Sequence, residues 1–359
     1  MTPFELSVRF FLQLAFILGA CRVFGLIAAR FGQPQVIGEI LAGIAIGPSV
    51  FGALLPAAQA WMFPAESKPV IASLSQIGLA VYMFLVGVEF DWSRIRTRLR
   101  IAAAVSISGI AAPLVLGGAA AWFLRDRLPL FSPQTGLLES MLFLGAAMAI
   151  TAFPILARII YERGLTGTSL GTLALAAGSI DDAAAWCILA VVLASFSHDA
   201  SIAVLAIGGG ALYAVVVATI IRPVLQKLAR AVEQRGELDH GTLGFTLLLV
   251  MLGAWFTDAI GIYAVFGAFV LGVAVPAGFF AGQLRASLEK MTTCLLLPLF
   301  FVSSGLNTSF SLLGEASLLG ATLLLLAVAI AGKGIACYLA ALANGESHRD
   351  ALSIGTLMN

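Results

Sequence analysis

Two adjacent aspartates, Asp181 and Asp182, lie inside an apolar stretch that is long enough to cross a lipid bilayer. A charged side chain at the centre of a membrane helix costs about 2.5–3.5 kcal/mol on insertion scales, so such residues usually mark a functional site. A carboxylate at this depth can bind a cation or carry a proton. The pair therefore predicts an ion or proton path, and a structural polar network between helices is the competing interpretation.

A buried cation, Lys333, is expected at a similar depth in a later apolar segment. With a rise of about 1.5 Å per residue, Asp181 lies about 18 Å from Ser169 and Lys333 lies about 16 Å from Asn344. Opposite charges at one depth are expected to pair, because each alone would remain uncompensated. Successive helical residues point about 100° apart, so one aspartate can face Lys333 while its neighbour faces a cavity. The alternative is that Lys333 snorkels to the inner interface.

A third element is expected at the same level, in the segment AMAITAFPILARII. Pro154 lacks a backbone donor and clashes with the carbonyl four residues earlier, so it predicts a helix break. A broken helix exposes carbonyls, which membrane proteins tolerate where they line a cavity. We therefore expect Thr151 and the carbonyls around Ala152 and Phe153 to join the aspartate pair as oxygen ligands for a small hard cation. A simple kink, and a Thr151 hydroxyl bonded to its own helix, are the alternatives.

The composition indicates a polytopic membrane protein. The chain is 60% hydrophobic and only 11% charged, against roughly 25% charged residues in soluble domains. The net charge is +1, without a basic tail, so no nucleic-acid partner is expected. The cysteines are scattered singly and the histidines fall in expected loops. Neither a cofactor, a disulfide framework nor a metal centre is therefore expected, apart from the transported ion.

The membrane spans follow from the rule that about 20 apolar residues cross the hydrocarbon core as a helix. Eleven crossings are predicted, and a twelfth begins near His348. The eleven lie at residues 5–29, 34–54, 69–90, 99–124, 137–161, 169–197, 200–222, 241–258, 261–280, 285–306 and 311–343. The predicted fold class is therefore an all-α polytopic membrane protein.

Basic residues are distributed unevenly between alternate loops. With the N-terminus outside, the outer loops hold three of them, Lys68, Arg125 and Arg127. The inner loops then hold fourteen, namely Arg30, Arg94, Arg96, Arg98, Arg100, Arg158, Arg163, Arg222, Lys227, Arg230, Arg235, Arg285, Lys290 and Arg349. The positive-inside rule therefore predicts that the N-terminus lies outside.

Six segments, in order along nearly the whole chain, resemble the monovalent cation/proton antiporters, specifically the Kef-type and plant cation/H+ exchanger branch. They are PQVIGEILAGIAIGPS (34–49), AVYMFLVGVEFD (80–91), AITAFPILARII (149–160), GSIDDAAAW (178–186), LPLFFVSSGLNT (297–308) and GKGIACYLAALANGESHRDALSIGTLMN (332–359). A single fragment of this kind would mean little, whereas the ordered series is specific.

The resemblance implies a sodium/proton-antiporter fold, in which two inverted six-helix repeats with broken helices are joined by a linker helix. In this sequence the first repeat would span 1–197, the linker helix and inner loop 198–240, and the second repeat 241–359, within one exchanger domain, 1–359. The second repeat is expected to be incomplete, because the sequence stops inside the second broken helix. A homodimer is implied as well, with a dimerisation surface made from the first three spans and the eighth to tenth.

The resemblance also assigns roles to residues. Asp182 resembles the family's obligatory carboxylate, which binds either the cation or a proton. Asp181 resembles the preceding aspartate of the electrogenic sodium/proton exchangers, which pairs with a lysine, here Lys333. The two aspartates are expected to titrate as a coupled set. Because this acid pair lies on a Kef-type framework, both Na+ and K+ remain open as the transported ion.

We therefore expect a secondary transporter, not an enzyme, that exchanges Na+ or K+ for H+ by alternating access. It would be a multi-pass protein of a bacterial inner membrane, in contact with the lipid bilayer. One alternative is a gated, glutathione-type potassium efflux system that uses the same residues without tight coupling. Another is a non-transporting membrane sensor or inactive fragment. A sodium/organic-anion symporter would share the architecture but would not need the aspartates and the lysine.

Overall fold

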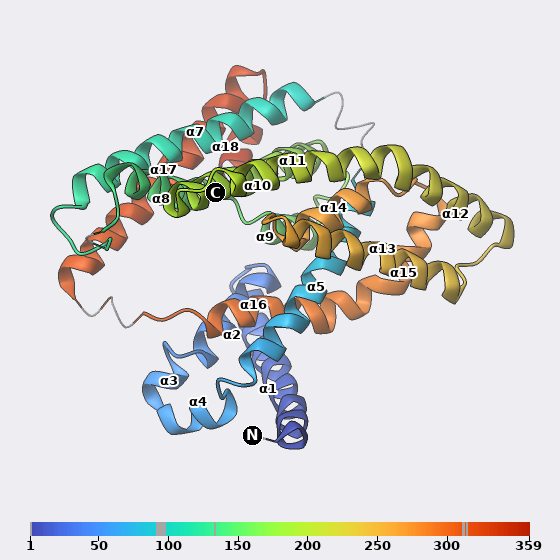
Figure 1. Cartoon of the computed structure of the whole chain (residues 1–359), viewed down its shortest axis with the longest axis horizontal. Helices are drawn as coiled ribbons and strands as arrows, with labels where there is room; N and C mark the ends of the chain where they lie inside the picture. Colours follow the sequence, from blue (N-terminus) through green and yellow to red (C-terminus); the bar gives the residue numbers. More distant parts are fainter. Residues whose placement is uncertain (1, 91–97, 133, 311–312, 314) are drawn as a thin grey trace. The chain divides into compact units, whose positions relative to one another are not determined.

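The computed structural model describes residues 2–90, 98–132, 134–310, 313 and 315–359, and all regular elements in these residues are helices (Figure 1). Ten helical stretches of the described chain are long and apolar enough to cross a membrane, and the shorter apolar helix α14 (Ala264–Val273) adds another. The all-helical, multi-pass fold class is thus confirmed. Arg94, Arg96 and the first residues of the predicted span 311–343 lie outside the described residues.

The chain forms two compact units, and each unit draws on both halves of the sequence. Unit 1 comprises Met1–Phe90, Val216–Phe256 and Ala264–Leu312, whereas unit 2 comprises Asp91–Val215, Thr257–Tyr263 and Leu313–Asn359. Unit 1 therefore holds the first three predicted spans and most of the eighth to tenth. Unit 2 holds the fourth to sixth and the eleventh. The predicted repeat boundaries cut across both units and remain predictions.

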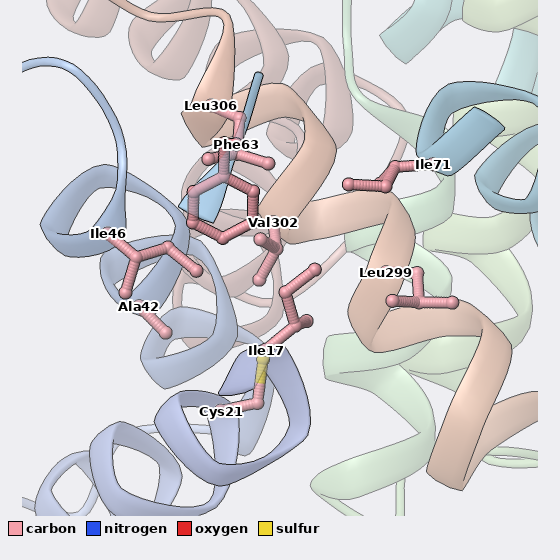
Figure 2. Packing of buried hydrophobic residues seen from close by; sticks show 9 residues of the cluster. All are labelled: Ile17, Cys21, Ala42, Ile46, Phe63, Ile71, Leu299, Val302 and Leu306. Carbon is pink, nitrogen blue, oxygen red and sulfur yellow. The ribbon is translucent and has the colours of Figure 1, made fainter. Parts of the chain in front are cut away.

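Unit 1 surrounds an apolar core in which α1, α2 and α5 pack against α16. Its helices are α1 (Pro3–Arg30), α2 (Gln35–Ile46), α3 (Phe51–Leu54), α4 (Pro56–Met62), α5 (Lys68–Val88), the π-helix η1 (Val217–Ile221), α12 (Arg222–Arg235), most of α13 (His240–Ala259), α14, α15 (Phe279–Met291), the π-helix η2 (Thr292–Leu296) and α16 (Leu297–Leu306). The core side chains are Ile17, Cys21, Ala42, Ile46, Phe63, Ile71, Leu299, Val302 and Leu306 (Figure 2).

The crossing of α2 and α16 depends on two glycines. A Cβ atom added to Gly305 would lie 2.2 Å from the carbonyl carbon of Gly43, so the two backbones are in direct contact. Small residues at such crossings allow membrane helices to approach closely and to gain van der Waals contact. Any side chain larger than hydrogen at Gly305 would separate the helices.

Unit 2 is organised around α7, which packs against α8, α10 and α17 (Figure 1). Its helices are α7 (Leu99–Leu124), α8 (Leu137–Ala149), α9 (Phe153–Glu162), α10 (Ser169–Ser197), α11 (Ser201–Val216), α17 (Ala316–Ala343) and α18 (His348–Leu357). The Thr168 side chain caps α10 by accepting from the backbone N–H of Gly171, 3.1 Å away. α10 also packs against α8, α9 and α18. The long helices α7, α10 and α17 thus pack around α8 and α9, the two halves of an interrupted span.

Candidate functional site

The fifth predicted span is interrupted between α8 and α9. Residues 150–152 are not helical, and the backbone of Ile150 is extended, with φ −65° and ψ 131°. Pro154 lies in the first turn of α9, where a proline is favoured because the N–H that it lacks would have no helical partner. The interruption therefore precedes the proline by one turn.

The interruption releases the carbonyl of Ala149. In a continuous helix this oxygen would accept from the N–H of Phe153, four residues later. Phe153 instead donates to the carbonyl of Thr151, at 2.9 Å. The ammonium group of Lys333, on α17, donates to the Ala149 carbonyl in its place. The helix break thus creates an acceptor for a buried cation.

Lys333 also contacts Asp181, at the middle of α10. The Lys333 Nζ atom lies 3.5 Å from Asp181 Oδ2, and the two residues are 2% and 0% exposed. The hydroxyl of Thr151 donates to the same oxygen, at 2.8 Å, and also lies 3.3 Å from the carbonyl oxygen of Met358, directly after α18. Three separate segments of unit 2 therefore meet at this carboxylate, and Thr151 connects it to a fourth, the end of α18.

These additional hydrogen bonds decide whether the buried pair is tolerable. Removing two charges from water costs several kcal/mol per ion, roughly, and the attraction between them offsets this only when further hydrogen bonds satisfy both groups. Lys333 has the Ala149 carbonyl and Asp181 has the Thr151 hydroxyl. Removing either partner of the pair would leave an uncompensated charge in the interior.

Asp182 lies in different surroundings from its neighbour. Its side chain is partly exposed, and Trp186 follows one turn later on the same face of α10. Trp186 in turn stacks on Tyr263, with ring centroids 4.8 Å apart and an interplanar angle of 29°. The structure thus brings Asp181, Lys333 and Thr151 together, and places Asp182 beside an aromatic pair.

The carbonyl group of Ala152, one of the cation ligands predicted from the sequence, is already hydrogen-bonded within the protein. The carbonyl of Ala152 accepts from the N–H groups of Ile155 and Leu156, at 2.9 and 3.1 Å, and so closes the first turn of α9. Phe153 is the first residue of α9 and is buried. The carbonyl that meets a charged group is that of Ala149, which sequence reasoning did not single out.

α7 also packs against the cluster formed by Asp181, Lys333 and Thr151, at the position of Gly109. A Cβ atom on Gly109 would lie 2.7 Å from Cys337 Sγ, 3.8 Å from Asp181 Oδ2 and 3.9 Å from Lys333 Cε. The thiol of Cys337 is itself buried and lies 3.7 Å from the carbonyl oxygen of Val105. Gly109 was missed in the sequence, because a glycine in an apolar span gives no sign of the helix that it meets.

No cluster of three or more His, Cys, Asp or Glu side chains suited to a resident metal is found in the described part of the chain. The polar groups of the site are carboxylates, a hydroxyl, backbone carbonyls and one ammonium. Oxygen ligands of this kind suit hard cations.

The comparisons with known proteins agree on one family. A family model described as "Sodium/hydrogen exchanger, transmembrane" matches residues 14–359. The "Na(+)/H(+) antiporter NhaS4" of Synechocystis sp. is 40% identical over 345 residues, which cover 96% of this chain and 84% of that protein. "Cation/H(+) antiporter 20" of Arabidopsis thaliana is 35% identical over 97% of this chain, but only 42% of its own length is matched.

Two further matches extend the range of relatives. "K(+)/H(+) antiporter 1" of Saccharomyces cerevisiae is 28% identical over 98% of this chain and 41% of its own length. The chain thus spans less than half of the plant and yeast relatives. The solved structure of the sodium proton antiporter MjNhaP1 from Methanocaldococcus jannaschii has the same fold, with a TM-score of 0.66, 18% identity and coverage of 98% of this chain and 82% of that one.

Proposed function

Because the chain belongs to the sodium/hydrogen exchanger family, we propose that it is a cation/proton antiporter that exchanges Na+ or K+ for H+ across a bacterial inner membrane. The observation that carries this proposal is the buried contact of Asp181 with Lys333 and Thr151 at an interrupted helix. Buried charges are costly in a membrane and are kept where an ion or proton moves. Asp182, the next residue, supplies a second carboxylate.

Asp182 is the proposed exchange group. When protons are scarce, its ionised carboxylate binds a partly dehydrated cation, and Asp181, Thr151 and nearby backbone carbonyls supply further oxygen atoms. When protons are abundant, protonation of the carboxylate removes the negative charge and releases the cation. Since one carboxylate cannot hold both ions, each turnover replaces one with the other.

Lys333 is the proposed charge partner that makes this exchange reversible. The arriving cation competes with the ammonium for Asp181, since both are attracted to the same negative charge. The Ala149 carbonyl stays available to Lys333 while the carboxylate turns towards the cation. The ammonium group then returns to Asp181 when the cation leaves. Alternating access is proposed to arise from movement of unit 2 as one body, because all of these residues belong to it.

Purified protein in liposomes that enclose a pH-sensitive dye tests the function. Adding Na+ or K+ on one side should drive protons to that side, in an amount proportional to the cation that enters. A cation conductance without proton movement would favour the efflux-channel alternative. If neither ion moves, the non-transporting alternative is favoured and the proposal is wrong.

A further inference from the structure

Ser106, in the first third of α7, differs from the other buried hydroxyl residues in the described part of the chain. Its side chain is 0% exposed, and its Oγ atom has no hydrogen-bond partner among the described residues. Buried serines and threonines in helices commonly donate to the carbonyl four residues earlier. Among the described residues, four buried hydroxyl side chains do so, at 2.7 to 2.9 Å: Ser75, Ser140, Thr246 and Thr292. The Ser106 hydroxyl is thus not engaged by its own helix.

Ser106 lies on the face of α7 that approaches Asp181, because a Cβ atom on Gly109, three residues later, would lie 3.8 Å from Asp181 Oδ2. Gly109 lies one turn further along the same face of α7, and its Cα approaches both Asp181 and Lys333. Asp181 uses Oδ2 for Lys333 and Thr151, whereas Oδ1 is buried and has no hydrogen-bond partner among the described residues. Ser106 Oγ and Asp181 Oδ1 are therefore two buried polar atoms in one region of unit 2 that lack partners among the residues described. Such atoms are costly unless another state of the protein satisfies them.

We propose that Ser106 is a positioning residue for Asp181. When Lys333 detaches, the Ser106 hydroxyl donates a hydrogen bond to the Asp181 carboxylate. This proposal rests on the proposed function, in which a cation separates Asp181 from Lys333. Without Lys333, the buried ionised carboxylate would keep the neutral Thr151 hydroxyl as a donor, which compensates a full charge poorly. Ser106 replaces the lost ammonium contact with a neutral hydrogen bond, and so keeps Asp181 ionised and oriented while the cation is bound.

The pH at which Asp181 takes up a proton depends on the charged and polar groups that face its carboxylate. Lys333 and Cys337 face it from α17, and Asp182 lies next to it on α10. The break segment contributes the Thr151 hydroxyl, and α7 contributes Ser106 and Gly109. Ser106 and Thr151 are the neighbours that carry a neutral hydroxyl, so removing either side-chain hydroxyl changes neither a charge nor a titratable group.

The test compares Ser106→Ala with Ser75→Ala, a matched loss of a buried helical hydroxyl on α5. In liposomes, the pH of half-maximal cation-driven exchange should move upward by about one unit in Ser106→Ala, because an ionised carboxylate that loses a donor binds its proton more tightly. Ser75→Ala should leave this pH unchanged. Ser106→Cys, which keeps the side-chain size but has a weaker donor, should show a smaller shift in the same direction.

A second measurement does not require transport. The melting temperature of the detergent-solubilised protein is followed against pH for the same variants. Ser106→Ala should displace the midpoint of the pH dependence, whereas Ser75→Ala should change the melting temperature equally at every pH. If Ser106→Ala and Ser106→Cys match the parent midpoint in both assays, the role of Ser106 is wrong. An inactive parent protein with a displaced Ser106→Ala melting midpoint would overturn only the proposed function.

Discussion

Asp181 and Asp182 are neighbours in sequence but have different partners. Asp181 is fully buried and holds Lys333 and Thr151, whereas Asp182 is partly exposed beside Trp186. The turn of about 100° between successive helical residues accounts for the separation. A charge-holding role and an ion-binding role can therefore be assigned to two different residues, and each can be tested by substitution.

Thr151→Val should weaken apparent cation affinity about tenfold, since a hydrogen bond to a charged group contributes about 1.5–3 kcal/mol. Valine preserves the side-chain shape but removes the donor to Asp181. The measurement is the cation concentration that gives half-maximal proton flux in liposomes. Thr151→Ser, which retains the hydroxyl, should remain near the parent, as should Thr322→Val on the exposed side of α17. An unchanged Thr151→Val affinity would contradict the role of this hydroxyl.

Lys333→Ala should destabilise the protein by about 3–5 kcal/mol, because it leaves the Asp181 charge buried without compensation. Thermal unfolding in detergent measures the effect. Adding Asp181→Asn to Lys333→Ala removes that remaining charge and should restore much of the stability. A Lys333→Ala protein as stable and as active as the parent would exclude this pair from the mechanism.

At the level of single residues, the pairing of Asp181 with Lys333 could be anticipated because helix geometry converts sequence distance into depth. The Ala149 carbonyl could not, because a backbone oxygen has no sequence signature. Its release depends on where the helix stops, and Pro154 locates that point only to within a turn. Ser106 likewise resembles any serine in an apolar helix in the sequence. Only the structure shows that its hydroxyl does not donate to the carbonyl four residues earlier.

Among the helices, the contact of α7 with α17 is set by the absence of a side chain at Gly109. Gly109→Ala places a Cβ atom 2.7 Å from Cys337 Sγ, which is too close for the pair to remain in position. Overpacking of this kind costs about 1–3 kcal/mol. The melting temperature should therefore fall, and exchange should fall with it because Lys333 is carried on α17.

The double variant Gly109→Ala/Cys337→Ala provides the control for that prediction. Removing the sulfur makes room for the added methyl group, so part of the lost melting temperature should return. Cys337→Ala alone should have a small effect on exchange, since the thiol contacts only the Val105 carbonyl among hydrogen-bond acceptors in the described residues. If the double variant is no more stable than Gly109→Ala, the close approach of α7 and α17 is not the cause.

The helices themselves could largely be predicted from the sequence, because an apolar run of about 20 residues is long enough to cross the hydrocarbon core as a helix. The spans around residues 99–124 and 169–197 agree with α7 and α10 to within a residue. The π-helical segments η1 and η2 were not predicted, because their hydropathy is the same as that of an ordinary helix. Segment length alone also gave no indication of which helices pack together.

For the whole molecule, the orientation in the membrane is predicted from the distribution of basic residues between the loops. With the N-terminus outside, the loop at Asp199 faces outward and the loop at Glu237 faces inward. Both side chains are exposed. In a cysteine-free background, a membrane-impermeant maleimide added to intact cells should label Asp199→Cys and should label Glu237→Cys only after the membrane is permeabilised. The reverse pattern would invert the assignment.

The partition into two units could not be derived from span positions, because each unit joins segments that are far apart in the chain. The resemblance to antiporters supplied the grouping of the first three spans with the eighth to tenth. The composition of the units follows that grouping closely, with the short segment Thr257–Tyr263 belonging to unit 2. Gly209 and Gly210 of α11 face Ile260 and Ile262 of this segment, which shows why small residues are needed there.

The most direct test of the account is cation-driven proton flux through Asp182→Asn in liposomes, with Asp199→Asn in an exposed loop as the matched control. Asparagine keeps the size of the side chain but can neither bind a proton nor carry the charge that holds a cation. Asp182→Asn is expected to fold normally and to move neither ion, whereas Asp199→Asn is expected to exchange at the parent rate. Exchange by Asp182→Asn at the parent rate would contradict the assignment of the site.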